Sequence, residues 1–314
     1  MEVKRFIVRG KKGQDISCFK IVPKQVDGVV HIMHGMGEHK ERYLDFAQFL
    51  AANNYAVYVH DHRKHGDSVQ GGDEVGIFTK RDKWLDIIND CSFVNRKIKK
   101  ELPNVKVITL GHSMGSIIAR KFISFYPKSS DLAIIMGTLP PFGLGKALVP
   151  LVMTSIMSLF NPNNERSLFM AKQLNAPLIK DFEPRRTDFD WITSDEAIVD
   201  KYVADPLCGY AYSTRFYKEF FKGILDVNKS DVVFATKEMP ILFISGKLDP
   251  VGEYGEGVKA TRELYSGHGF LDLSLKIVEN ARHEVLNEKN KDETYQYILE
   301  WITKNIKKIE TELD

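Results

Sequence analysis

Short apolar runs of strand length alternate with segments of helical spacing along much of this chain. The runs cover residues 29–33, 56–60, 105–110 and 132–136, and helical periodicity at 42–52, 81–99 and 115–125 falls between them. Buried parallel strands are almost continuously apolar because helices cover both faces of their sheet. The alternation therefore predicts an α/β fold with a mostly parallel central sheet of about eight strands and helices on both faces.

The alternation stops after residue 137 and resumes after residue 206. Residues 138–206 contain helical pieces near 144–160, 167–174 and 195–202, with proline-rich joints. We expect a core whose first part is 1–137 and second part 207–314, interrupted after the sixth strand by a helical cap at 138–206. Because ligands of α/β sheets bind at the carboxyl ends of the strands, an insertion there can act as a lid.

A Gly-x-Ser-x-Gly motif lies where a predicted strand meets a predicted helix. It reads Gly111-His112-Ser113-Met114-Gly115 and directly follows the run at 105–110. Glycines at both ends allow a turn so tight that the serine hydroxyl is exposed above the sheet. This pattern predicts that Ser113 is a catalytic nucleophile.

A serine nucleophile needs a base, and the base needs an acid that orients it. Asp249 follows the apolar run 241–245, and His283 follows the predicted strand 271–278. Both residues would lie at the sheet edge that carries Ser113, in the order serine, acid, histidine. We therefore predict that His283 is the base and Asp249 the orienting acid.

Acyl transfer also requires hydrogen-bond donors for the oxyanion that develops on the substrate. One donor is the backbone N–H after the nucleophile, which belongs to Met114. The second comes from the loop after the third strand, where Met36 lies between two glycines. The sequence thus predicts an oxyanion hole built from the N–H groups of Met36 and Met114.

Three histidines gather in the segment after the run at 56–60, which raises the question of a metal. They are His60, His62 and His65. The cluster has neither the helical His-x-x-x-His spacing nor a cysteine of the usual zinc patterns. We expect no metal site and no cofactor.

Five motifs in order resemble the monoacylglycerol lipase and lysophospholipase group of α/β-hydrolases, over residues from about 29 to 301. The motifs are His34-Gly35-Met36-Gly37-Glu38-His39 with Arg42-Tyr43, Asp61-His62-Arg63 with His65-Gly66 and Ser68, Gly111-His112-Ser113-Met114-Gly115, Ser245-Gly246 with Asp249-Pro250-Val251, and Arg282-His283-Glu284 with Asn287-Glu288. The cap segments Phe189-Asp190-Trp191 and Asp205-Pro206-Leu207-Cys208-Gly209-Tyr210 are similar to those of bacterial members.

This resemblance implies an α/β-hydrolase fold and a cofactor-free serine hydrolase that acts on carboxylic esters with an apolar acyl chain. It also implies that Glu38 and Arg42 contact the polar head group of the substrate. An ion pair that braces the loop is an equally open interpretation of these two residues. The chain departs from the family at Lys64 and Asn280, where glycine is usual, and at Ser116.

We predict hydrolysis of single-chain lipid esters, of the monoacylglycerol or lysophospholipid type, through a Ser-His-Asp triad and an acyl-enzyme. A peptidase or thioesterase with the same triad is the alternative. A peptidase could bind a substrate amine through one of five acidic residues of the cap, namely Glu165, Asp181, Glu183, Asp188 and Asp190. A non-catalytic binding protein on this fold would require a broken triad, and none is visible.

The apolar stretch 143–160 of the cap, rich in leucine and methionine, either packs within the cap or lines an acyl tunnel and touches a membrane or micelle. A formal net charge of +2 gives no general attraction for nucleic acid. Three scattered cysteines and the absence of an apolar leader lead us to expect a cytoplasmic protein. The sequence leaves the oligomeric state open.

Overall fold

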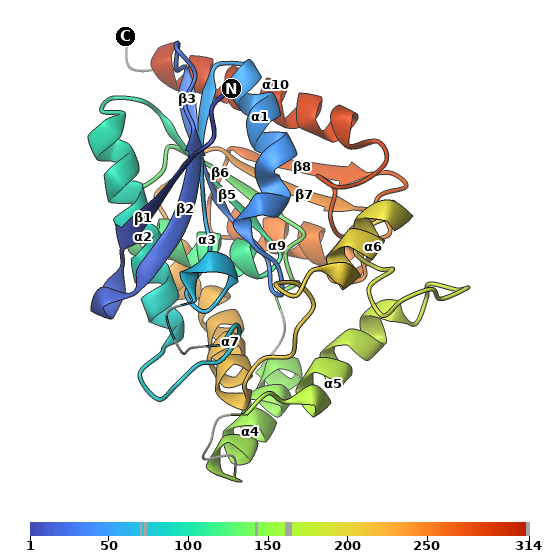
Figure 1. Ribbon diagram of the computed structural model, residues 1–314. Coiled ribbons are helices and arrows are strands. Elements are labelled where there is room, and N and C mark those ends of the chain that lie inside the picture. The colour runs from blue at the N-terminus through green and yellow to red at the C-terminus, as the bar shows by residue number, and fades with distance from the viewer. Residues whose placement is uncertain (70, 72–73, 142–143, 161–164, 312–314) are drawn as a thin grey trace.

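An eight-stranded sheet forms the centre of the protein, with helices on both faces (Figure 1). The computed structural model describes all residues except 70, 72–73, 142–143, 161–164 and 312–314. The strand order is β1-β2-β4-β3-β5-β6-β7-β8. The strands are β1 (Lys4–Arg9), β2 (Asp15–Ile21), β3 (Gly28–Met33), β4 (Tyr55–His60), β5 (Val107–His112), β6 (Leu132–Met136), β7 (Ile241–Gly246) and β8 (Leu273–Val278).

Strand direction follows the sequence pattern. β2 pairs antiparallel with β1 and with β4, while β4, β3, β5, β6, β7 and β8 pair parallel. Five of the six parallel strands are buried along their whole length, in keeping with their apolar composition. The sixth, β8, lies at the sheet edge and is partly exposed. The predicted α/β class and the mostly parallel sheet are confirmed.

Helices cover the sheet in two layers. α1 and α10 cover one face, where Leu50 and Ile298 enter the core, and α2, α3 and α9 cover the other, with Ile88, Ile118 and Val258. The helices are α1 (Leu44–Ala52), α2 (Trp84–Glu101), α3 (Met114–Phe125), α4 (Leu144–Phe160), α5 (Leu168–Ile179), α6 (Glu196–Ala204), α7 (Thr214–Val227), α8 (Ser230–Phe234), α9 (Glu256–Ser266) and α10 (Lys291–Thr311). Short 3₁₀ turns are η1 (Lys11–Gly13), η2 (Lys40–Tyr43), η3 (Gly66–Ser68) and η4 (Glu253–Gly255).

The helices α4, α5 and α6 follow β6, as expected for the insertion. α4 and α5 lie at the lower end of the molecule in Figure 1, beyond the sheet, and α4 packs against α7. The first residue of the predicted apolar stretch, at position 143, lies outside the described residues. The remainder of that stretch forms α4, which contains Pro150.

The sheet and α3 meet in a contact that leaves no room for a side chain. A Cβ atom built on Gly115 would overlap the carbonyl oxygen of Met33, at the end of β3. A Cβ atom on Gly111 would overlap the carbonyl oxygen of Gly115 in turn. This backbone-to-backbone approach brings the start of α3 against the end of β3.

We predict that Gly115→Ala lowers the free energy of unfolding by about 3 kcal/mol or more, since overpacking against rigid backbone is costly. Gly267→Ala is the matched control: it has helical dihedrals, and its nearest neighbour would lie 3.4 Å from the added Cβ. Urea unfolding of both variants measures the difference. Equal stability of the two proteins would contradict the packing described here.

Candidate active site

Ser113 lies at a sharp turn between β5 and α3. Its φ of 54° and ψ of −120° are in a region that side chains rarely adopt, as at nucleophile elbows. The backbone N–H of Ser113 donates to the carbonyl of Met136 over 2.9 Å. The hydroxyl of Ser116, a departure from the family pattern, donates to the Ser113 carbonyl over 2.5 Å. These contacts hold the turn in place, and Ser113 lines a cavity of about 400 Å³.

Asp249 follows β7, at the predicted place. It accepts hydrogen bonds from the Ser245 hydroxyl at 2.8 Å and the Val251 N–H at 2.9 Å, and its Oδ1 lies 2.9 Å from His283 Nδ1. The carboxylate is fully buried. Burial alone would raise its pKa, but His283 and the two donors lower the pKa of Asp249 below its ordinary value. Asp249 is therefore an anion that can orient the imidazole.

His283 lines the same cavity as Ser113, and one of its two ring nitrogens is bound to Asp249. With Nδ1 bound to Asp249, Nε2 is buried and has no hydrogen-bond partner in the described part of the chain. The rings of Trp191 and His112 contact the His283 ring, with centroid distances of 5.2 Å and 4.7 Å. An imidazole that donates from Nδ1 to a carboxylate carries its lone pair on Nε2, where a hydroxyl proton can be accepted.

The loop after β3 is fixed on both sides of Met36. The Gly35 N–H donates to Glu38 over 2.5 Å, the Gly37 N–H donates to the Tyr212 hydroxyl, and the Gly37 carbonyl accepts from Gly209 over 3.0 Å. Met36 and Met114 both line the cavity. Met114 opens α3, where backbone N–H groups have no carbonyl partner within the helix. Both predicted oxyanion donors thus border the same cavity as Ser113.

Glu38 and Arg42 form part of a buried ion network. Arg42 lies 2.9 Å from Glu38 and makes two contacts with Glu284, of 2.6 Å and 2.7 Å. Burial would raise the pKa of Glu38, but hydrogen bonding to His112 and the charge of Arg42 hold it well below its usual range. This arrangement agrees with the interpretation that the pair braces the loop, although Glu38 also lines the cavity.

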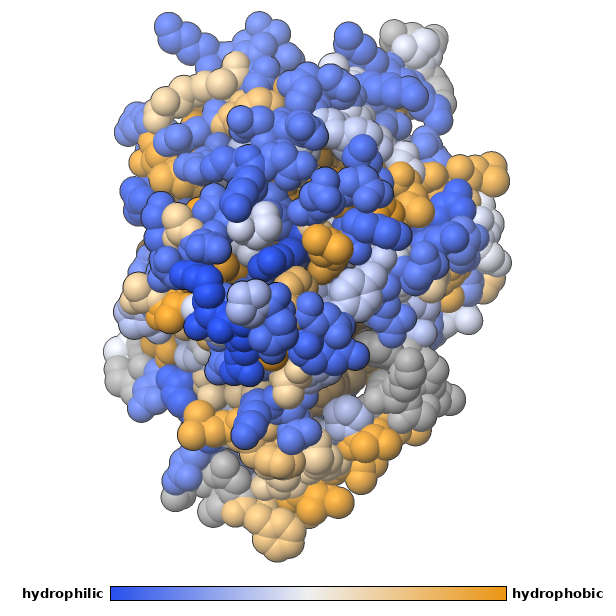
Figure 2. Space-filling model, turned by 90° about the vertical axis from the view of Figure 1, so that its right-hand side faces the viewer, coloured by the Kyte–Doolittle hydropathy of each residue, from blue (hydrophilic) through white to orange (hydrophobic). Residues whose placement is uncertain are grey.

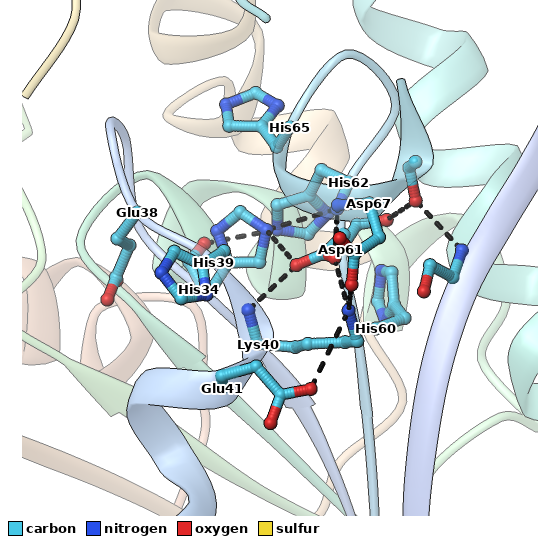
Figure 3. A network of polar contacts seen from close by, with 12 residues as sticks. His34, Glu38, His39, Lys40, Glu41, His60, Asp61, His62, His65 and Asp67 are labelled. Atoms are coloured by element: carbon cyan, nitrogen blue, oxygen red, sulfur yellow. Dashed lines mark hydrogen bonds and ion pairs between the residues drawn. The ribbon is translucent and has the colours of Figure 1, made fainter. Parts of the chain in front are cut away.

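A second buried ion pair, which sequence reasoning missed, holds the neighbouring loops. Lys40 is 1% exposed, its Nζ lies 2.7 Å from Asp61, and its backbone N–H donates to the same carboxylate (Figure 3).

Lys64 and Asn280 have left-handed φ values of 61° and 58°, which explains why glycine is usual at both positions. The chain places side chains there without altering the site itself.

Apolar and aromatic side chains form most of the remaining cavity wall. They come from the cap, from the segment between α6 and α7, from α7 itself and from the loops after β6 and β7: Leu139, Leu174, Leu178, Phe189, Trp191, Ile192, Tyr202, Tyr210, Tyr212, Tyr217, Phe220, Phe221, Ile224 and Val251. The five acidic cap residues considered as amine anchors do not line the described cavity. Such a wall suits an apolar chain better than a charged amine.

Known proteins similar to this chain include several lipases and esterases. The model of the Hydrolase_4 family, described as serine aminopeptidase, S33, matches residues 24–290. A monoacylglycerol lipase of Mycolicibacterium smegmatis is 25% identical over 280 residues, covering 89% of both chains. The monoglyceride lipase of Homo sapiens is 25% identical over 264 residues, which are 83% of this chain and 76% of that protein.

Solved structures match over nearly the whole chain. A thermostable carboxyl esterase from Bacillus coagulans, in complex with glycerol, has a TM-score of 0.89 at 25% identity and covers 98% of this chain and 99% of its own. A soluble variant of monoglyceride lipase from Saccharomyces cerevisiae has a TM-score of 0.69 at 20% identity and covers 97% of this chain and 94% of its own.

Among the described residues, none of the helices is long and apolar enough to span a membrane.

We predict that Glu38→Gln lowers the free energy of unfolding by about 2–4 kcal/mol, because it removes the charge of one buried partner of Arg42. Asp15→Asn, in the exposed pair with Arg9, is the control and should cost under about 1 kcal/mol. Urea unfolding and steady-state kinetics are measured together. Unchanged stability with a raised KM would favour the head-group contact instead.

Proposed function

This chain belongs to the Hydrolase_4 family, described as serine aminopeptidase, S33, and we propose that it cleaves the esters of single-chain lipids, of the monoacylglycerol or lysophospholipid type. It is a carboxylic ester hydrolase with the α/β-hydrolase fold. One observation carries the finer proposal. His283, held by Asp249 at Nδ1, has a buried Nε2 without a partner among the described residues, and His283 and Ser113 line the same apolar cavity.

The reaction starts at the Ser113 hydroxyl. Its oxygen attacks the ester carbonyl carbon while its proton passes to His283 Nε2, and the Met36 and Met114 N–H groups bind the oxyanion. Collapse of this intermediate breaks the bond to the alcohol, which leaves with the proton from His283. Asp249 stays ionised throughout and stabilises the imidazolium.

Water completes the cycle. His283 takes a proton from a water molecule, whose oxygen attacks the acyl-enzyme carbonyl, and returns a proton to Ser113 as the fatty acid leaves. Binding energy for the acyl chain comes from the aromatic and aliphatic cavity wall, at about 0.8 kcal/mol for each buried methylene group. An apolar wall of this extent supports a lipid acyl group as the substrate part bound there.

The peptidase and thioesterase alternatives use the same residues, and the family description itself names an aminopeptidase. Three carboxylates line the described cavity. Glu38 and Glu284 are already paired with Arg42, so that an incoming amine would compete with a buried guanidinium for them, and Glu253 is exposed to solvent. Together with the apolar wall, this favours an uncharged ester over a peptide with a free amino terminus.

The cap contributes a second apolar surface, on its outside. On α4 the exposed side chains Leu148, Val149, Val152, Ile156, Leu159 and Phe160 follow helical spacing, and Leu168 and Phe169 continue them on α5. Figure 2 shows hydrophobic side chains at this lower end of the molecule. Pro150 of α4 and Leu174 of α5 line the cavity. We propose that this cap surface contacts a membrane or micelle from which the lipid enters.

Ser113→Ala should abolish both ester hydrolysis and covalent labelling by a fluorophosphonate, since both need the serine oxygen. Asp249→Asn should fold normally and lower kcat about 10,000-fold, because it disturbs the orientation and tautomer of His283. Ser266→Ala, at the exposed end of α9, is the matched control and should retain both properties. Activity is measured on monoacylglycerols, lysophospholipids, acyl thioesters and aminoacyl-naphthylamides in parallel.

Undiminished hydrolysis by Ser113→Ala would overturn the assigned nucleophile. Faster turnover of aminoacyl-naphthylamides than of any lipid ester, lost in the same variant, would keep the triad and replace the substrate class. Normal folding of each variant is checked by its urea unfolding curve.

The double variant Val152→Ser and Ile156→Ser should bind phosphatidylcholine vesicles at least about tenfold more weakly, because each buried aliphatic side chain contributes about 1.5–3 kcal/mol. Vesicle co-sedimentation measures binding. Hydrolysis of a water-soluble short-chain ester should not change, since both side chains are more than half exposed. Leu271→Ser is the control, because Leu271 is 87% exposed outside the cap. Equal vesicle binding by all three proteins would contradict the proposed contact.

A further inference from the structure

Two histidines and a cysteine from distant parts of the chain converge beneath the active-site loops. His60 ends β4, His62 follows it, and Cys91 lies in the middle of α2. One ligand atom from each lies within 4.8 Å of the other two, and all three residues are buried. No cysteine lies near this histidine cluster in the sequence, which is why the sequence predicted no metal there. In the folded protein, Cys91 lies beside His60 and His62.

The hydrogen bonds of His62 determine where its lone pair lies. Its Nε2 is 3.1 Å from the carbonyl oxygen of His34, and a carbonyl can only accept, so Nε2 carries the proton (Figure 3). Nδ1 is then unprotonated. It is buried and has no hydrogen-bond partner in the described part of the chain. A buried lone pair without a partner is unfavourable, and a bound cation would satisfy it.

His60 also has one ring nitrogen that is hydrogen-bonded and one that can face a metal. Its Nδ1 pairs with His31 Nε2 at 3.1 Å, and its Nε2 lies 3.6 Å from the Cys91 sulfur. Histidines that bind metals usually use their second nitrogen for a hydrogen bond of this kind, which orients the ring. With Nδ1 turned to His31, the Nε2 of His60 is the nitrogen that faces Cys91.

The separation of Cys91 and His60 fits metal–ligand bond lengths. Bonds of about 2.3 Å to sulfur and about 2.0 Å to nitrogen place the sulfur and the nitrogen about 3.5–3.7 Å apart in tetrahedral or trigonal sites. The observed distance from Cys91 sulfur to His60 Nε2 is 3.6 Å. Thiolate and imidazole ligands suit soft or borderline ions.

Ligand number and charge select among these ions. Three protein ligands fall short of the four that structural zinc sites use. One thiolate with a monovalent ion gives a neutral set, whereas a divalent ion would add a buried positive charge, and the nearby carboxylates of Asp61 and Asp90 are already paired with Lys40 and Arg63. We propose that His60, His62 and Cys91 form a three-coordinate site for copper(I). The Cys91 thiol releases its proton to solvent as sulfur binds the metal, and no electron is transferred.

The test uses the full-length protein, refolded anaerobically with one equivalent of copper(I) or zinc(II), desalted, and analysed for metal content. We expect about one copper per chain, a raised thermal midpoint, and X-ray absorption showing one sulfur and two nitrogen neighbours. Cys91→Ser and, separately, His62→Phe should each lose at least about 90% of the copper. Cys208→Ser is the matched control, because Cys208 lies in a different group with His39 and Asp205.

Copper below about 0.1 equivalents in the refolded wild-type protein would overturn the proposal, provided that its esterase activity shows that it refolded. Copper retained by Cys91→Ser but lost by Cys208→Ser would assign the metal to the other group and overturn it as well. Preference for zinc over copper would overturn the choice of a monovalent ion. Loss from Cys91→Ser and His62→Phe alone supports the site, independently of which ester the enzyme cleaves.

Discussion

The contact between the start of α3 and the end of β3 is the constraint on which the site depends. Because Gly115 has no side chain, its backbone packs directly on the carbonyl of Met33. The same approach brings the loop after β3 against the nucleophile turn, so that a Cβ atom on Gly35 would lie 3.1 Å from Ser113 Cβ. The proposed nucleophile and the proposed oxyanion loop, which follow separate strands, are thereby held beside each other.

A single guanidinium links this loop to the loop that carries the base. Arg42 binds Glu38 on one side and Glu284, the residue after His283, on the other. Burying these charges is costly, but the two carboxylates together supply three close contacts to the cation. Loops that are 242 residues apart in the chain are thus held together, and these loops carry the proposed oxyanion donor Met36 and the proposed base His283.

The sequence patterns predicted strands and the residues that directly follow them. They did not predict contacts between residues that lie far apart in the chain. Asp249 and His283 could be predicted because each follows an apolar strand, and the carboxyl ends of parallel strands share one edge. The run at 105–110 predicted β5, but the strand spans Val107–His112, since pairing with β3 and β6 continues to the nucleophile turn. α8 has only five residues, too few to show a helical period.

Other groups left no local signal at all. Tyr212 binds the Gly37 N–H from 175 positions away, and Cys91 reaches His60 across 31 positions. A lysine such as Lys40 is expected at the surface from its sequence alone, but in the structure it is buried and paired with Asp61. Such partners become visible only when the fold brings their elements together, because neither spacing nor composition encodes a contact of this range.

The helices α4 and α5 carry apolar residues in two settings that composition could not separate. Pro150 and Leu174 line the cavity, while Ile156 and Leu159 are exposed. The groups proposed for bond cleavage all follow strands of the sheet, whereas much of the cavity wall comes from these helices and from α7. If the proposed roles hold, the helices that follow β6 can therefore differ in length and shape while the elbow, acid and base remain as they are.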